Sequence, residues 1–96
     1  MLKPYVLNFN PDTCPRQKIL DLLDTLPAVK NWYAFLPSAV FIISDQNAHI
    51  LAQQLLAKVN GSFYFLSEVS PNAYNGWLPK PAWDFINDPK SSGRWP

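Results

Sequence analysis

The chain has 96 residues, of which 48% are hydrophobic, 15% aromatic and 16% charged, and its formal net charge is +1. Its length and apolar content suit one globular core, and they exclude a second domain and intrinsic disorder. The near-neutral charge argues against a dedicated nucleic-acid binder, and the single cysteine, Cys14, excludes an intrachain disulfide framework and a multi-thiolate zinc site.

Apolar runs along the chain are short. None approaches the ~20 residues that span a bilayer. Residues 1–12 contain no continuous apolar segment before a small-residue cleavage site, so no signal peptide is expected. We therefore expect a cytoplasmic protein without a membrane partner.

Residues 3–9 are predicted to form the first strand, because side chains of two kinds alternate along them. One face of this strand would carry Tyr5, Leu7 and Phe9, and the opposite face would carry Val6 and Asn8. Proline at position 4 is compatible with a strand only at its start, which is where it stands.

A helix is predicted to follow, beginning near Pro15 and ending at about Leu26. Four apolar side chains recur along it at helical spacing: Ile19, Leu22, Leu23 and Leu26. Either Asp12 or Thr13 would cap its first turn. Pro27 would end the helix, because proline removes a backbone hydrogen bond.

Four more elements are predicted along the rest of the core. Two strands, at 31–36 and 38–44, would form an antiparallel hairpin around Pro37. The polar residues 44–47 would cap a second helix that ends at Asn60-Gly61. Residues 62–69 would form the last strand.

This order of elements predicts an α+β protein with the ferredoxin-like βαββαβ fold. Its four-stranded antiparallel sheet would carry both helices on one face. We expect residues 1–69 to form the core. Residues 70–96 would form an aromatic, proline-rich C-terminal tail that packs on the core or on a partner subunit.

The strands carry large apolar side chains on both faces, although two helices cover only one face and a wet face would be polar. The tail is one candidate cover: it holds Trp77, Trp83 and Trp95, and Pro81 would open a short helical turn over 82–87. The second candidate cover for this face is another copy of the chain. We expect both, with the tail swapped or laid across a homodimer seam, and we predict an interface of Val6, Val40, Ile42, Tyr64, Leu66, Trp77 and Trp83.

Four side chains are weak candidates for chemistry. Cys14 lies at a helix N-terminus, where free amides favour a thiolate, but no second cysteine or local histidine accompanies it. His49 and Asp45 have i, i+4 spacing, yet two ligands do not make a metal site. For Asp12 and Asp45 we favour helix capping. The sequence therefore predicts no catalytic, metal or cofactor site.

Aromatic residues on the central strands offer an alternative function. Tyr5 with Phe41 or Phe9 would form a stacking surface for a single-stranded nucleic acid, as in sheet-based RNA-binding domains. The sequence favours core or interface packing for these rings, because its basic complement is small.

Several segments resemble a known group of proteins: residues 5–9, 31–33, 41–45, 76–78 and 83–86. They are similar to small uncharacterised bacterial and phage proteins, which resemble the ferredoxin-like homodimers of the CRISPR-adaptation and virulence-associated nuclease group. In the nuclease members a metal-binding aspartate closes the first strand. Here that stretch is Asn8-Phe9-Asn10, with Asp12 two residues further on, and an amide brings no charge to a magnesium site.

From these observations we expect a small homodimeric, non-catalytic binding or accessory protein with another protein as partner, related to a phage or mobile element. Two alternatives stay open. One is a divergent metal-dependent nuclease that uses Asp12 or Asp45 from both subunits. The other is a single-stranded nucleic-acid binder that uses the sheet face.

Overall fold

Four antiparallel strands form the sheet on which the rest of the molecule is built, and their order is β2-β3-β1-β4. The computed structural model describes residues 1–59, 62–70 and 74–90. Its strands are β1 (Lys3–Phe9), β2 (Asn31–Leu36), β3 (Ala39–Ser44) and β4 (Tyr64–Glu68). The helices are α1 (Arg16–Leu23), α2 (Ala48–Leu56) and α3 (Lys80–Asn87). The α+β class and the four-stranded antiparallel sheet predicted from the sequence are confirmed.

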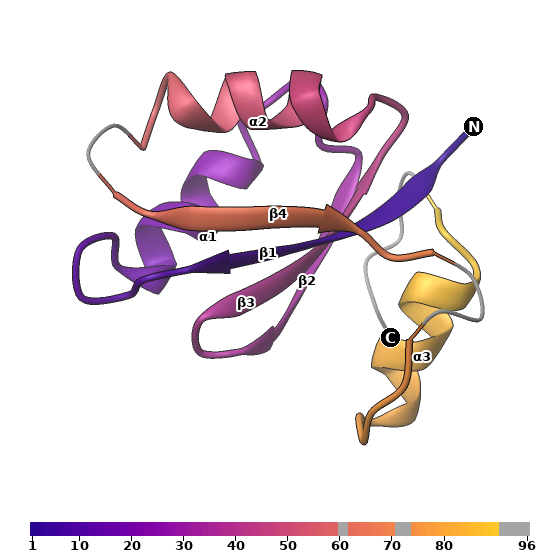
Figure 1. Ribbon diagram of the computed structural model, residues 1–96. Coiled ribbons are helices and arrows are strands. Elements are labelled where there is room, and N and C mark those ends of the chain that lie inside the picture. Colours follow the sequence, from indigo (N-terminus) through magenta and orange to yellow (C-terminus); the bar gives the residue numbers. More distant parts are fainter. Residues whose placement is uncertain (60–61, 71–73, 91–96) are drawn as a thin grey trace.

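The chain forms two β-α-β segments, and in the sheet the two strands of each segment are separated by one strand of the other segment. The strands β1 and β2, which α1 connects, both run antiparallel to β3 and lie on either side of it. Likewise β3 and β4, which α2 connects, lie on either side of β1. The two centre strands are therefore β1 and β3, and the two edges are β2 and β4 (Figure 1).

The first face of the sheet is the one that α1 and α2 cover (Figure 1). Tyr5 and Leu7 of β1 lie opposite Ile42 and Val40 of β3. These four side chains pack with the buried residues of both helices: Ile19, Leu20, Leu23, Leu51 and Leu55. Because burying one such aliphatic side chain contributes about 1.5–3 kcal/mol, this cluster is the main source of stability.

Part of the second face is covered by the C-terminal segment of the same chain, of which residues 74–90 are described. Phe41 and Ile43 of β3 pack with Phe85 and Ile86 of α3. The Phe85 ring meets that of Tyr33 edge-on, with 5.7 Å between centroids. The helix starts at Lys80, two residues before the predicted turn, and Pro81 lies in its first turn as expected.

The ends of the first two helices differ from the prediction in part. No side chain caps α1: Asn10 closes the preceding loop, because its Oδ1 accepts from the Asp12 amide at 3.0 Å. The prediction that Asp12 or Thr13 caps α1 is therefore wrong. The helix ends at Leu23, before the predicted Leu26, and a turn leads on to Pro27.

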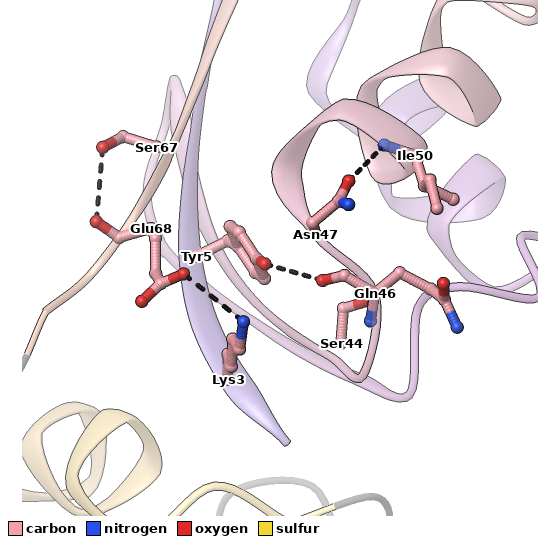
Figure 2. A network of polar contacts seen from close by, with 8 residues as sticks. All are labelled: Lys3, Tyr5, Ser44, Gln46, Asn47, Ile50, Ser67 and Glu68. Atoms are coloured by element: carbon pink, nitrogen blue, oxygen red, sulfur yellow. Dashed lines mark hydrogen bonds and ion pairs between the residues drawn. The ribbon is translucent and has the colours of Figure 1, made fainter. Parts of the chain in front are cut away.

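The start of α2 lies at the predicted residues 44–47, but the capping role favoured for Asp45 is wrong, because Asn47 caps the helix instead. Asn47 is its N-cap residue, and its Oδ1 accepts from the Ile50 amide at 2.9 Å (Figure 2). The predicted end of this helix at Asn60-Gly61 lies outside the described residues, as does Trp95.

Tyr5 ties the centre of the sheet to the start of α2. Its side chain is 0% exposed, and its hydroxyl donates to the Gln46 carbonyl at 2.6 Å (Figure 2). The Ser44 hydroxyl accepts from the Gln46 amide at 3.0 Å, so both ends of this turn are held. Burial raises the pKa of Tyr5 above its usual value of 10.0, and the negative charge of Glu68 raises it further.

We expect Tyr5→Phe to lower the unfolding free energy by about 0.5–1.5 kcal/mol at neutral pH, since the Gln46 carbonyl loses its donor. Above pH 10.0 the tyrosine ionises more readily in the unfolded chain than in the folded one, so the wild type loses stability as the pH rises. The phenylalanine variant has no hydroxyl at this position to ionise, so the difference in unfolding free energy between the two proteins should become smaller as the pH rises. Urea unfolding on both sides of pH 10.0 tests this, and a constant difference would contradict it.

We expect Phe85→Ala to lower the unfolding free energy by about 3–5 kcal/mol, because it empties the contact between α3 and the sheet. Trp77→Ala, at a fully exposed tryptophan on the same segment, should change it by less than about 0.5 kcal/mol. Urea unfolding followed by far-UV circular dichroism measures both values. Equal effects of the two variants would mean that α3 contributes no core on the second face.

Candidate functional site

An apolar groove lies between the second face of the sheet and the C-terminal segment. Its volume is about 250 Å³. Val6, Phe35 and Phe41 line it from the three strands β1, β2 and β3. The other lining residues follow β4 or belong to the C-terminal segment: Val69, Tyr74, Asn75, Gly76, Trp77, Leu78, Trp83 and Ile86. None of these lining residues carries a charge, so the groove suits an apolar or aromatic ligand group.

Stacked aromatic rings form two walls of the groove. Phe35 and Phe41 lie parallel on the sheet, with centroids 3.9 Å apart. Tyr74 stacks on Trp83 at 6.1 Å, and the Tyr74 hydroxyl donates to the Asn87 side chain. Side chains held by stacking and hydrogen bonding lose little further freedom when a ligand binds, which favours recognition.

Trp77 stands at this groove with its side chain 100% exposed. Two other aromatic side chains also reach solvent, Phe63 at 90% and Phe65 at 66% exposure. Phe65 lies opposite Asn8, next to the pair of Val6 and Ser67, and therefore projects from the same face as Val6. Large exposed aromatic groups in contiguous regions of a surface are typical of binding sites.

Four residues of the predicted interface lie on the first face of the sheet, not on the second face with Val6. Val40 and Ile42 are fully buried beneath α1 and α2, and Tyr64 and Leu66 pack against the same core. The reason is register: Leu7 lies opposite Val40, so Val6 shares its face with Phe41 instead. Of the predicted set, Val6, Trp77 and Trp83 do line the second-face groove, and their contact with a partner stays a prediction.

Cys14 is part of the first-face core, where its side chain is 3% exposed. It precedes α1, as expected, but it points into the apolar cluster that contains Leu7 and Ile19. No partner thiol exists in this chain. The structure therefore places Cys14 as a packing residue.

The two candidate aspartates lie far apart. Asp12 follows the end of β1 and Asp45 follows the end of β3, and these strands run antiparallel with Lys3 opposite Ser44. The two carboxylates therefore lie at opposite ends of the sheet. Exposed His49 lies one turn after Asp45, and its Nε2 is 3.3 Å from Gln53 Nε2. Within residues 1–59, 62–70 and 74–90 no three His, Cys, Asp or Glu side chains gather closely enough to hold a metal ion.

The three aromatic rings considered as a stacking surface for single-stranded nucleic acid are all buried in the protein. Tyr5 and Phe9 are buried on the first face, while Phe41 is buried on the second face beneath Phe35. Tyr5 and Phe9 thus share the first face, Phe41 lies on the second, and none of the three rings is exposed to stack on a base.

Phe63 and Phe65 were missing from the predicted site, as were Phe35 and Tyr74. Alternation along residues 63–66 separates Phe65 from Tyr64 and Leu66, but it does not say which set faces the helices. In the fold Tyr64 and Leu66 pack against the first-face core, and the half-buried Tyr64 hydroxyl donates to the Ala52 carbonyl at 3.0 Å. The sequence does carry one signal for exposed aromatic side chains here. Phe63 and Phe65 alternate with Tyr64 and Leu66, so if one pair packs on the core, the other pair must face away from it.

Comparison of the chain with protein-family models, with curated proteins and with solved structures gives no match. Among the helices that the structure describes, none is long and apolar enough to cross a membrane.

We expect Cys14 to react with a thiol reagent at least about tenfold more slowly in the native protein than in denaturant, because the reagent must wait for local opening. The time course of reaction with Ellman's reagent, with and without urea, measures this. Equal rates would show that the thiol is accessible and would restore it as a candidate nucleophile.

Proposed function

We propose that this protein is a small homodimeric, non-catalytic binding protein that recognises another protein through the second-face groove. The observation that carries the proposal is Trp77, fully exposed beside an uncharged groove with aromatic walls. Tryptophan is enriched among the residues that dominate binding energy at protein interfaces. An apolar side chain of a partner would fill the groove, and Trp77 would close over it.

We further propose that the fold is ferredoxin-like. Support comes from the βαββαβ order of the first six elements and from the two β-α-β segments that split each other. The helix α3 is an addition to that pattern. A cytoplasmic location and a link to phages or mobile elements rest on the sequence and stay predictions.

The nuclease alternative has less support. Asp12 and Asp45 lie at opposite ends of the sheet, so one chain does not bring them to one metal. A shared site would need the same aspartate from two copies, and each copy would then supply a single exposed carboxylate. A site that takes one carboxylate from each of two copies would require the copies to meet at that loop, with substrate phosphates completing the coordination of the magnesium ion.

Affinity capture from the native host tests the binding function. We expect the protein to retain a partner that Trp77→Ala binds at least about tenfold more weakly, because truncating an aromatic anchor of an interface costs about 2 kcal/mol or more. Ile50→Ala is the matched control, since Ile50 is an exposed apolar residue on α2. Equal capture by all three proteins would contradict a role for the groove.

The same preparations decide between binding and cleavage. Incubation with labelled DNA and RNA in the presence of Mg²⁺ or Mn²⁺ should leave the nucleic acids intact. Metal-dependent cleavage that Asp12→Ala or Asp45→Ala abolishes would overturn the proposal in favour of the nuclease.

A further inference from the structure

The edge of the sheet at β4 is open. No described strand pairs with β4 on the side away from β1. The opposite edge is protected in two ways: the pairing of β2 with β3 is irregular between Tyr33 and Leu36, and α3 packs against Tyr33. Bulges and covering helices are devices that prevent a sheet edge from pairing with another chain.

The backbone groups that face this open edge follow from the register. The Val69 amide donates to the Pro4 carbonyl at 2.9 Å, so Val69 and Pro4 lie opposite each other as a hydrogen-bonded pair. In an antiparallel ladder such pairs alternate, and Ser67 and Phe65 therefore also direct their backbone groups toward β1. The amides and carbonyls of Tyr64, Leu66 and Glu68 consequently point outward.

β4 lacks the usual protection against edge pairing. It contains no proline, and it pairs with β1 without a register shift. Its one charged residue is Glu68 at the last position, where Lys3 Nζ lies 4.0 Å from the carboxylate (Figure 2). Natural edge strands are commonly shielded by lysine, proline or a bulge.

The open edge is also apolar. Phe63 and Phe65 are 90% and 66% exposed, so that together the two residues present about 300 Å² of surface to solvent per chain. Pairing of two copies would cover part of this surface together with the backbone edge of both strands, and both contribute to the roughly 1,000 Å² that a specific interface buries.

From these observations we propose that two copies of the chain join through β4, which pairs antiparallel with β4 of the second copy and extends the sheet across a two-fold axis. This inference rests on the homodimer of the proposed function and specifies how its subunits meet. It leaves the groove open to a different partner.

The strand is complementary to itself in one register. With Leu66 opposite Leu66 of the other copy, Tyr64 lies opposite Glu68, and all outward backbone groups of both strands are paired. Phe65 then lies opposite Ser67, with the two Phe65 rings diagonal to each other across the axis. The two Glu68 carboxylates are kept apart at opposite ends of the pair, so no like charges meet. A two-fold axis closes the assembly at two copies.

A cysteine pair tests this geometry directly. In the proposed register residues 65 and 67 of different copies have Cα atoms about 4.5 Å apart, within the range that a disulfide spans. We expect the double variant Phe65→Cys/Ser67→Cys to form at least about tenfold more covalent dimer on mild oxidation than the wild type, because paired strands raise the effective thiol concentration. Cys14 is present in both proteins, and its burial makes the wild type a suitable control.

A charge variant tests the same edge without oxidation. Phe65→Lys should raise the dimer dissociation constant at least about tenfold, because a lysine on an edge strand opposes pairing and the two lysines would lie close across the axis. Leu36→Lys, at an exposed leucine on the opposite edge, should leave it unchanged. Sedimentation equilibrium measures the constant, and circular dichroism verifies that each variant is folded.

The outcomes separate this inference from the proposed function. If the chain is dimeric, but Trp77→Cys cross-links and Phe65→Cys/Ser67→Cys does not, the copies meet through the second face. The edge proposal is then overturned while the homodimer stands. If the wild type is monomeric at every concentration, both the edge pairing and the homodimer are overturned.

Discussion

The pairing of β1 with β3 is the constraint on which the rest of the structure depends. Its register places Tyr5 and Leu7 opposite Ile42 and Val40, and so it decides which side chains α1 and α2 bury. A shift by one residue would turn every one of these side chains to the other face. The same register sends Val6, with Phe41, to the second face, where α3 and the groove are built on them.

Covering the second face with a segment of the same chain has a consequence for the surface. The helix α3 packs over Ile43 and Tyr33, near one end of the sheet, through Phe85 and Ile86. The aromatic residues toward β4 are left outside this contact, and Phe65 remains 66% exposed. One short helix is too small to cover a whole sheet face. The apolar surface that remains uncovered forms the groove and adjoins the open edge of β4.

Much of the fold could be predicted from local patterns. Alternation at residues 3–9 and the apolar stripe of α1 specified element types, since each depends only on neighbouring residues. The cap of α1 was mispredicted. The Asn10 side chain accepts a hydrogen bond from the Asp12 amide and closes the loop, and neither Asp12 nor Thr13 caps the helix. The predicted interface residues are divided between the two faces of the sheet, because alternation within β3 does not say which of its side chains lie opposite Val6.

The sequence by itself determined that both sheet faces are apolar and that an aromatic tail was available to cover one of them, because composition and periodicity are properties of the chain alone. Only the tertiary structure decided that α3 folds back on its own sheet, that the aspartates lie apart, and that β4 is an open edge. These outcomes depend on strand order and register. Pairing between residues distant in the chain fixes both of them, and no local pattern encodes it.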